Sequence, residues 1–209
     1  MLYLNTVTPK TYGLLKTLMQ IDDLCDFALV GGTNLSLKLG HRISIDLDIF
    51  TNKPFDKEEV ERCIIRQLPR AIKLDQRKQS IWFSTDEIKV DIILHEYKYI
   101  EPVETIDDIR FVSIADIIPM QLEAMATRGV KKDFWGIAEL LNHYSLAQML
   151  AFYQRKYPQS DIGHIVLSMT YFEDAEKQKE NPEDLRSITW KEVKNKVKKA
   201  VEDFVKMQF

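Results

Sequence analysis

The chain has 209 residues, and 29 Lys and Arg residues against 32 Asp and Glu residues give it a formal net charge of −3. With 45% hydrophobic and 29% charged residues, its composition is that of a globular protein with a packed core. The near-neutral charge excludes a strongly basic nucleic-acid coat, and no stretch approaches the roughly 18 apolar residues of a membrane span. The first residues lack a secretion signal, and Cys25 and Cys63 form no disulfide framework. We therefore expect a cytoplasmic protein.

The residue pattern of the N-terminal segment predicts a helix, a strand and a second helix. Thr8 followed by Pro9 is typical of a helix start, since a capping hydroxyl precedes proline in the first turn. The apolar run 27–30 predicts a buried strand that ends at the pair Gly31–Gly32. A short helix is expected to follow and to end near Gly40.

The next elements show strand periodicity interrupted by one helix. Residues 45–50 alternate strictly between apolar and polar side chains, which predicts a strand. Residues 57–67 have the spacing of an amphipathic helix. The segments 80–85 and 89–94 flank Asp86–Glu87 and predict a β-hairpin, although this turn lacks the favoured glycine.

The pattern changes to helices from residue 113 onward. We expect five of them, at roughly 113–127, 131–143, 145–156, 161–178 and 189–207. This change of period divides the chain into a core of residues 1–110 and a helical C-terminal lobe of residues 111–209 packed on it. The predicted fold class is α+β.

Three aspartates are the candidate catalytic residues. On a strand, side chains two residues apart share a face, so Asp46 and Asp48 should point together, away from Ile45, Leu47 and Ile49. Two carboxylates on one face repel each other, and a divalent cation with a preference for oxygen ligands, such as Mg²⁺, would compensate them. Asp91 interrupts a second apolar strand in the same way. The three together predict a metal site for phosphoryl or nucleotidyl transfer.

A phosphate-binding turn is expected upstream of these acids. Glycines in the turn Gly31–Gly32–Thr33 allow close approach of a ligand, and the following helix offers free N–H groups to an anion. The Thr33 hydroxyl would add a donor. His41, Arg42 and Ser44 lie between this turn and the acids and could contact a triphosphate, Arg42 being the best suited because guanidinium matches phosphate geometry.

These motifs together resemble a known family. The stretch Gly31-Gly32-Thr33-Asn34-Leu35-Ser36-Leu37, followed by Gly40-His41-Arg42-Ile43-Ser44-Ile45-Asp46-Leu47-Asp48-Ile49-Phe50, is similar to the signature of the AbiEii/AbiGii toxin family in the polymerase-beta-like nucleotidyltransferase superfamily. The resemblance covers about residues 10–145. It implies a mixed sheet flanked by helices, with Asp46 and Asp48 as metal ligands and Asp91 as the third acid.

The same resemblance implies a reaction and partners. Members transfer a nucleoside monophosphate from a nucleoside triphosphate, with Mg²⁺ or Mn²⁺, to an acceptor that is a tRNA 3′ end or a protein in characterised relatives. They commonly occur in bacterial toxin–antitoxin or phage-defence pairs beside an antitoxin that binds DNA.

The helical half matches the family in some positions and departs in others. Arg128, Lys132 and Asp133 match and are expected to line the nucleotide site. Relatives carry a lysine where this chain has Gln121, and a second acid where it has Gly136. Loss of a cation near the triphosphate should weaken transition-state stabilisation.

Two other functions remain open at this point. A catalytically weak nucleotide-binding or regulatory protein could retain the fold, and the departures at Gln121 and Gly136 favour it. Alternatively, the C-terminal helices could act as a neutralising or assembly partner. The lysines in 191–199 could grip RNA phosphates, but a solvated helix face is the commoner explanation. Trp82, Trp135 and the tyrosines are interpreted as core or surface residues.

Overall fold

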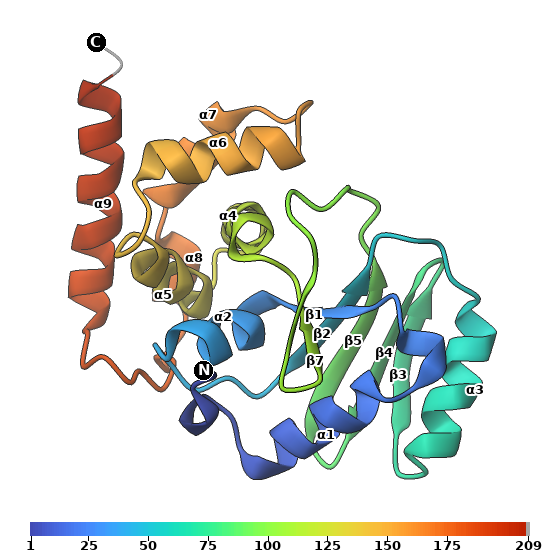
Figure 1. Ribbon diagram of the computed structural model, residues 1–209. Helices are drawn as coiled ribbons and strands as arrows, with labels where there is room; N and C mark the ends of the chain where they lie inside the picture. Colours follow the sequence, from blue (N-terminus) through green and yellow to red (C-terminus); the bar gives the residue numbers. More distant parts are fainter. Residues whose placement is uncertain (208–209) are drawn as a thin grey trace.

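A computed structural model describes residues 1–207 and contains a seven-stranded mixed sheet with helices on both faces (Figure 1). The strands lie in the order β3-β4-β5-β2-β1-β7-β6. Strand β2 pairs in parallel with β5, and β1 with β7, whereas the other neighbours are antiparallel. The strands are β1 Ala28–Val30, β2 Leu47–Thr51, β3 Ile72–Arg77, β4 Ser80–Thr85, β5 Ile88–Leu94, β6 Glu104–Ile106 and β7 Ile109–Phe111. This arrangement confirms the α+β fold class.

Two helices cover one face of the sheet. They are α1 (Pro9–Met19) and α3 (Lys57–Gln67), accompanied by the short 3-10 turns η1 (Leu4–Thr6) and η2 (Asp22–Leu24). Thr8 caps α1 by accepting from the backbone N–H of Thr11, and Asp56 caps α3 in the same way. Both predicted helix starts are therefore confirmed.

The remaining helices gather on the other side of the sheet and beyond its β1 end, as Figure 1 shows for α4 to α9. Val30 and Leu35 join their core, which contains buried side chains from α4, α5, α6, α7 and α9. The helices are α2 Gly31–Leu39, α4 Ile114–Arg128, α5 Lys131–Leu140, α6 Leu146–Lys156, α7 Ile162–Met169, α8 Glu173–Glu176 and α9 Trp190–Lys206. Residues 208 and 209, the end of the predicted 111–209 lobe, lie outside the described residues.

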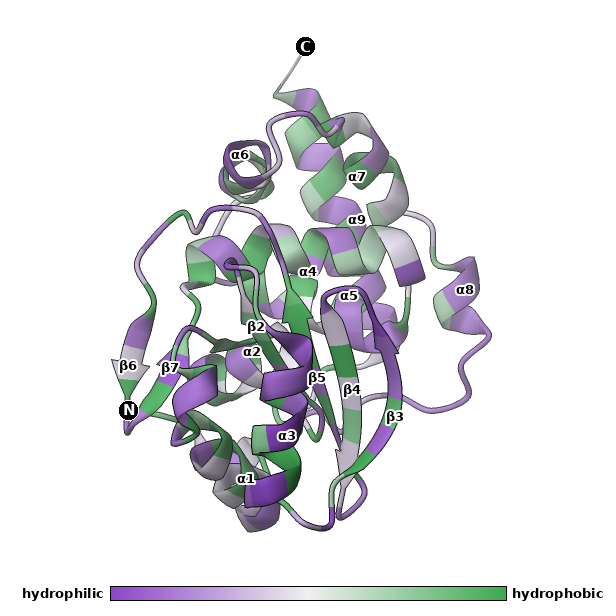
Figure 2. Ribbon diagram, turned by 90° about the vertical axis from the view of Figure 1, so that its right-hand side faces the viewer, coloured by the Kyte–Doolittle hydropathy of each residue, from purple (hydrophilic) through white to green (hydrophobic). Residues whose placement is uncertain are grey.

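Strands β2 and β5 show why the central sheet forms where it does. Leu47, Ile49, Val90 and Ile92 are at most 2% exposed and pack against the α1 and α3 side. Each gains on the order of 1.5–3 kcal/mol by burial. Figure 2 shows hydrophobic residues concentrated in these central strands and more hydrophilic residues in the edge strand β3. None of the helices within residues 1–207 has both the length and the apolar character needed to cross a membrane.

The structure corrects the predicted strand 45–50. Strand β2 begins at Leu47, so Asp46 precedes it, and the Thr33 hydroxyl donates a hydrogen bond to the Asp46 carbonyl. That carbonyl is thereby held by a side chain on α2. Ile45, expected on the buried face, is 54% exposed.

The predicted helix 161–178 is also wrong in its extent. It is two helices, α7 and α8, separated at Thr170–Phe172. The Thr170 hydroxyl donates to the Leu167 carbonyl, which competes with helix continuation, and Phe172 turns into the core against Phe134.

Strands β3, β6 and β7 were not predicted, because each is short or polar. Two of the hairpin turns, Asp86–Glu87 between β4 and β5 and Asp107–Asp108 between β6 and β7, have positive φ at both residues. Aspartate tolerates this conformation better than most residues, which is why both hairpins close without glycine.

Candidate functional site

The three candidate acids lie at the middle of the sheet. Asp48 on β2 and Asp91 on β5 are partners in the parallel register, so their side chains leave the same face. This face is opposite to the one on which Leu47 and Ile49 pack. Asp46 lies just before β2, with its side chain 47% exposed and one carboxylate oxygen 3.3 Å from the Lys132 ammonium. All three line one cavity of about 450 Å³.

The electrostatics of these acids differ from those of ordinary surface carboxylates. Burial, reinforced by the neighbouring Asp91 carboxylate, raises the pKa of Asp48 to about 6. Burial and the nearby Asp46 carboxylate also raise the pKa of Asp91. Among the described residues no cation forms a salt bridge with Asp48 or Asp91, whereas Asp46 pairs with Lys132. A divalent cation would supply the positive charge that Asp48 and Asp91 lack. The donor set, two carboxylates from the adjacent strands β2 and β5 and a third just before β2, suits Mg²⁺ or Mn²⁺.

The turn at the start of α2 makes room for two charged side chains. Gly31 has φ +67°, and a Cβ atom there would lie 2.1 Å from an Asp48 carboxylate oxygen. A Cβ atom at Gly32 would lie 2.1 Å from the Arg42 guanidinium. Glycine is therefore required at both positions, so that the carboxylate and the guanidinium can approach the backbone. No side chain caps the start of α2, which leaves its first N–H groups without a side-chain acceptor beside the cavity.

The residues expected around this turn separate into two groups. Arg42 and Ser44 line the cavity, and Arg42 is only 6% exposed, with Nη1 donating to the Ile43 carbonyl at 2.9 Å. Thr33 does not line it, because its buried hydroxyl donates to the Asp46 carbonyl and lies 2.9 Å from Ser44 Oγ. Thr33 thus positions the strand leading to the acids instead of offering a donor to phosphate.

His41 also lies away from the acids. It is 1% exposed and lines a separate cavity of about 330 Å³ beside Trp135 and Arg186. Burial, with the positive charge of Arg42 and then Arg186, lowers its pKa to about 3. The ring is therefore neutral at physiological pH. In this position it does not reach a nucleotide in the acidic cavity.

Helices α4 and α5 form the wall opposite the sheet. Asp133 is fully buried and receives a bidentate pair from Arg128, with Nε to Oδ2 at 2.8 Å and Nη2 to Oδ1 at 2.7 Å. The Lys132 ammonium reaches across the cavity to Asp46. The structure therefore brings Arg128, Lys132 and Asp133 to the same cavity as the three acids.

The two departures from the family pattern are in contact with each other. Gln121 on α4 lines the cavity and lies 3.4 Å from Asp133. A Cβ atom at Gly136 on α5 would lie 3.2 Å from the Gln121 side chain. The neutral Gln121 and the small Gly136 thus form one local arrangement.

Sequence reasoning missed the part of the cavity formed by β3, β4 and the start of β5. Leu74, Asp75, Arg77, Trp82 and Lys89 line it there. Trp82 was interpreted as a core or surface residue, whereas it lies directly opposite Asp91 in the β4–β5 register. The alternation of Trp82 with the buried Ile81 and Phe83 was the signal that could have placed it on the face of the acids.

A larger and more open cavity of about 880 Å³ adjoins the acidic one. Arg42, Ser44, Asp46, Lys89 and Lys132 line both. Its far wall is the segment 178–183 before α9, and Lys131 is held there by a 2.9 Å hydrogen bond from its ammonium to Asn181. Asp46 therefore lies at the junction of the two cavities, whereas Asp48 and Asp91 line the smaller one alone.

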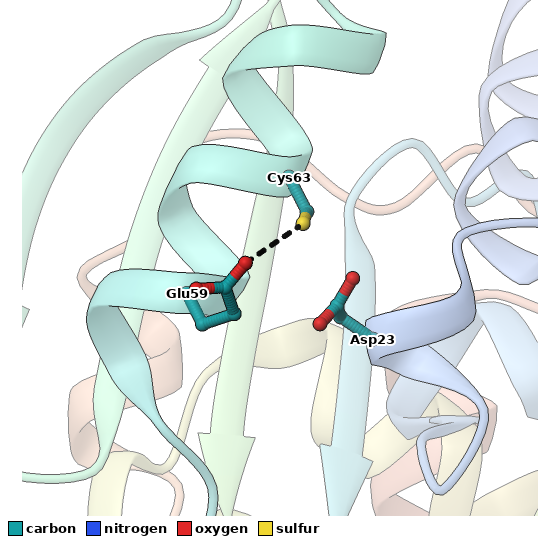
Figure 3. A group of neighbouring side chains, drawn as sticks. All are labelled: Asp23, Glu59 and Cys63. Carbon is teal, nitrogen blue, oxygen red and sulfur yellow. Dashed lines mark hydrogen bonds between the residues drawn. The ribbon is translucent and has the colours of Figure 1, made fainter.

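A second group of potential metal ligands lies elsewhere. Within residues 1–207, Asp23, Glu59 and Cys63 bring one ligand atom each within 4.8 Å of the others, a spacing that Asp46, Asp48 and Asp91 do not reach. Figure 3 shows this group between η2 and α3. The hydrogen-bonded Asp23 carboxylate, followed by burial, raises the pKa of the Cys63 thiol. A thiol held protonated is a poor metal ligand, so we assign it no site.

The chain is similar in sequence to a known protein family and to one bacterial protein. The sequence profile of the family described as "Nucleotidyl transferase AbiEii toxin, Type IV TA system" matches residues 13–206 and so includes the helical half. The uncharacterized protein aq_aa25 of Aquifex aeolicus is 36% identical over 186 residues, which cover 86% of this chain and 88% of that protein.

Two solved structures share the fold. MenT4, a nucleotidyltransferase toxin from Mycobacterium tuberculosis, has a TM-score of 0.57 at 13% identity, covering 93% of this chain and 84% of that one. JHP933 from Helicobacter pylori has a TM-score of 0.53 at 16% identity, covering 97% and 96%. The profile match over most of the chain and the relative at 36% identity lead to one conclusion: the chain belongs to the AbiEii family of nucleotidyltransferase toxins.

Proposed function

We propose that this protein transfers a nucleoside monophosphate from a nucleoside triphosphate to an RNA, such as a tRNA, or to a protein. The observation that carries this proposal is the pairing of Asp48 with Asp91 on adjacent parallel strands, with Asp46 in the same cavity. Under-compensated carboxylates at the bottom of a cavity that is also lined by cations match the needs of metal-assisted phosphoryl chemistry. Family membership makes a nucleoside triphosphate the expected donor.

Each group in the cavity has a proposed role. Asp46, Asp48 and Asp91 would hold Mg²⁺ or Mn²⁺, which, when bound, neutralises phosphate charge and polarises the acceptor hydroxyl. The start of α2 at Gly31–Gly32 and the Arg42 guanidinium would bind the β- and γ-phosphates.

Residues on α4 and α5 would complete the site. Arg128, Lys132 and Asp133 would position nucleotide or acceptor from the wall opposite the sheet, so that residues 1–110 carry the chemistry and the helical lobe closes the cavity.

The proposed reaction is a single displacement. The acceptor oxygen forms a bond to the α-phosphorus while the bond from that phosphorus to the bridging oxygen breaks, and pyrophosphate leaves. Asp91 would orient the acceptor hydroxyl and take its proton. In its biological setting the protein would act in the cytoplasm of a bacterium as the toxin of a type IV toxin–antitoxin pair, with an antitoxin partner and a role in phage defence.

The test is transfer from α-labelled nucleoside triphosphates, supplied one base at a time with Mg²⁺, to total tRNA and to total protein. The variants Asp46→Asn and Asp48→Asn should lose on the order of 1000-fold in rate. Asp203→Asn, a substitution of an exposed acid on α9, is the matched control and should keep full activity. Equal labelling by wild type and both site variants would overturn the proposal.

A catalytically weak nucleotide-binding or regulatory protein is the second candidate. The contact between Gln121 and Gly136 favours it, because it leaves a neutral side chain where relatives carry a lysine. The double variant Gln121→Lys/Gly136→Asp discriminates between the two functions. Transfer that appears only in this double variant, with nucleotide binding already present in the natural protein, would favour the regulatory role.

A further inference from the structure

The cavity extends beyond the acids along the same face of the sheet. Trp82 on β4 is the register partner of Asp91, and Asp75 on β3 is the register partner of Trp82. Residues paired in this way share a face, so the order across the sheet is Asp48, Asp91, Trp82 and then β3. Trp82 is half-buried and lines the cavity.

The Trp82 side chain is not needed for the core of the sheet. Its neighbours Ile81 and Phe83, on the opposite face, are 0% and 1% exposed and pack on the α1 and α3 side. The Arg77 guanidinium lies over the indole, 5.7 Å from the ring centroid. An indole with a cation over it, opening into a cavity beside a candidate catalytic carboxylate, is a surface for stacking a planar ring.

The position of Trp82 favours contact with the acceptor and not with the nucleoside triphosphate. The start of α2 and Arg42, the proposed phosphate-binding groups, lie on the β1 side of Asp48. Trp82 lies on the other side, beyond Asp91 and about 5 Å from it between paired Cα atoms. A hydroxyl presented to Asp91 by a nucleotide would leave the base of that nucleotide about one strand spacing further, over Trp82.

The charges around Trp82 favour a nucleic acid. Arg77 and Lys89 are exposed and line the cavity on either side of the indole. Lys89 and Lys132 also line the adjoining larger cavity, where Lys131 and Lys179 lie among the acids Asp46, Glu87, Glu180 and Glu183. Cations along a groove with an aromatic platform are the usual means by which proteins bind single-stranded nucleic acid without reading its sequence.

We propose that Trp82 and Arg77 form the acceptor platform, on which the terminal base of a single-stranded RNA end stacks while its hydroxyl faces Asp91. The proposal rests on the proposed nucleotidyltransferase function and specifies the acceptor class. Trp82 is then an acceptor-binding residue, and the larger cavity lined by Lys89 and Lys131 is the path of the preceding nucleotides.

Tryptophan fluorescence tests binding independently of transfer. The chain has three tryptophans, and Trp135 and Trp190 stack on each other, at a 5.5 Å centroid distance, outside the cavity. A single-stranded oligoribonucleotide with a free 3′ end should quench wild-type fluorescence, and Trp82→Phe should remove most of that quenching. A nucleoside triphosphate with Mg²⁺ alone should quench little. Strong quenching by the triphosphate alone would overturn the proposal, because Trp82 would then stack the donor base.

Kinetics provide the second test. Trp82→Ala should raise the KM for the RNA acceptor on the order of 10- to 100-fold and leave the KM for the triphosphate unchanged, whereas Trp82→Phe should recover most of the loss. Tyr171→Ala, which removes an aromatic side chain that is 50% exposed and lines neither cavity, is the matched control. An unchanged RNA KM in Trp82→Ala, or a protein acceptor that depends on Trp82 while RNA does not, would overturn the platform. Absence of transfer to any acceptor by wild type would instead contradict the proposed function, and the fluorescence result would still decide the platform.

Discussion

Two carboxylates, the fully buried Asp116 and the half-buried Asp48, have opposite surroundings in this molecule. Asp116, at the start of α4, is 0% exposed and accepts hydrogen bonds from the backbone of Ile100 and Glu101, from Ser113 Oγ and, at 2.7 Å, from the buried Lys156 ammonium. Asp48, on β2, has a raised pKa because burial and another carboxylate act on it together.

This difference distinguishes a carboxylate that holds the fold together from a carboxylate that belongs to a candidate binding site. Around Asp116 the protein supplies every compensating group itself, so the charge fixes the approach of α6 and of the 98–101 segment to α4. Around Asp48 the protein brings a second acid into register, so the compensation is left to something that binds. A buried charge without its own partner is a better indication of a site than burial alone.

The largest expected effect comes from breaking the compensated pair. Asp116→Ala should lower the free energy of unfolding by about 3–5 kcal/mol, because it leaves the Lys156 ammonium buried without its anion. Urea unfolding measured by circular dichroism would show this. The double variant Asp116→Leu/Lys156→Met removes both charges and should be less destabilised than either single variant. A loss below about 1 kcal/mol in Asp116→Ala would mean that the pair is not compensated as described.

The opposite result is expected at Asp48. A pKa of about 6 against an ordinary 3.8 means that the folded protein holds the proton more tightly than the unfolded chain does. The ionised group therefore destabilises the fold by up to about 3 kcal/mol above pH 6, and this penalty disappears below about pH 4. In EDTA at pH 8, Asp48→Asn should raise the Tm, although with Mg²⁺ the same variant should lose on the order of 1000-fold in transfer rate.

Added Mg²⁺ provides the control for that experiment. It should raise the Tm of wild type but not of Asp48→Asn, since only wild type retains the charge that the cation compensates. A lower Tm for Asp48→Asn in EDTA would place Asp48 with Asp116 among the structural acids.

Much of this contrast could be predicted from local sequence, because it depends on alternation. Asp48 interrupts Leu47 and Ile49, and Asp91 interrupts Val90 and Ile92, so each acid is assigned to a strand face without tertiary information. Helix starts at Thr8 and Ser113 are equally local, since a capping side chain lies within three residues of the backbone N–H that donates to it.

The other features of the site could not be predicted from local sequence, because they depend on contacts between distant segments. The role of Trp82 requires the β4–β5 register, and the need for glycine at Gly31 arises from the Asp48 carboxylate, 17 positions later in the chain. Local sequence assigns Thr33 to phosphate because it follows the glycine pair at the start of a helix. Its partner, the Asp46 carbonyl, becomes visible only when α2 and β2 are side by side.

His41 is a further buried titratable group, and we expect it to have an effect of intermediate size on stability. In the folded protein its pKa is about 3, lowered by burial and by the nearby Arg42 and Arg186, whereas Glu139 and Asp184 line the same cavity. Below about pH 6.5 the His41 ring is therefore protonated in the unfolded chain, whereas in the folded protein it stays neutral until about pH 3. Stability should fall by about 2 kcal/mol from pH 6.5 to pH 5 because of this one group.

The variant His41→Leu isolates the contribution of His41 to the pH dependence of stability. Neither ring nitrogen has a hydrogen-bond partner within the described residues, so the substitution removes no polar contact. The difference in unfolding free energy between wild type and variant, measured at pH 7.5 and pH 5, should change by about 2 kcal/mol in favour of the variant at pH 5. Parallel pH dependences would mean that the folded protein protonates His41 normally.

The smallest expected effect lies at the contact between Gln121 and Gly136, beside the buried Asp133. Alanine is favoured over glycine inside a helix by roughly 0.5–1 kcal/mol, but a Cβ atom at position 136 would meet Gln121 at 3.2 Å. Gly136→Ala alone should therefore change stability by less than about 0.5 kcal/mol, because the two terms oppose each other. In a Gln121→Ala background, which removes the obstacle, the same substitution should stabilise by the full helix preference. A double-mutant cycle measured by urea unfolding gives the coupling, and a coupling near zero would show that the two departures from the family pattern are independent of each other.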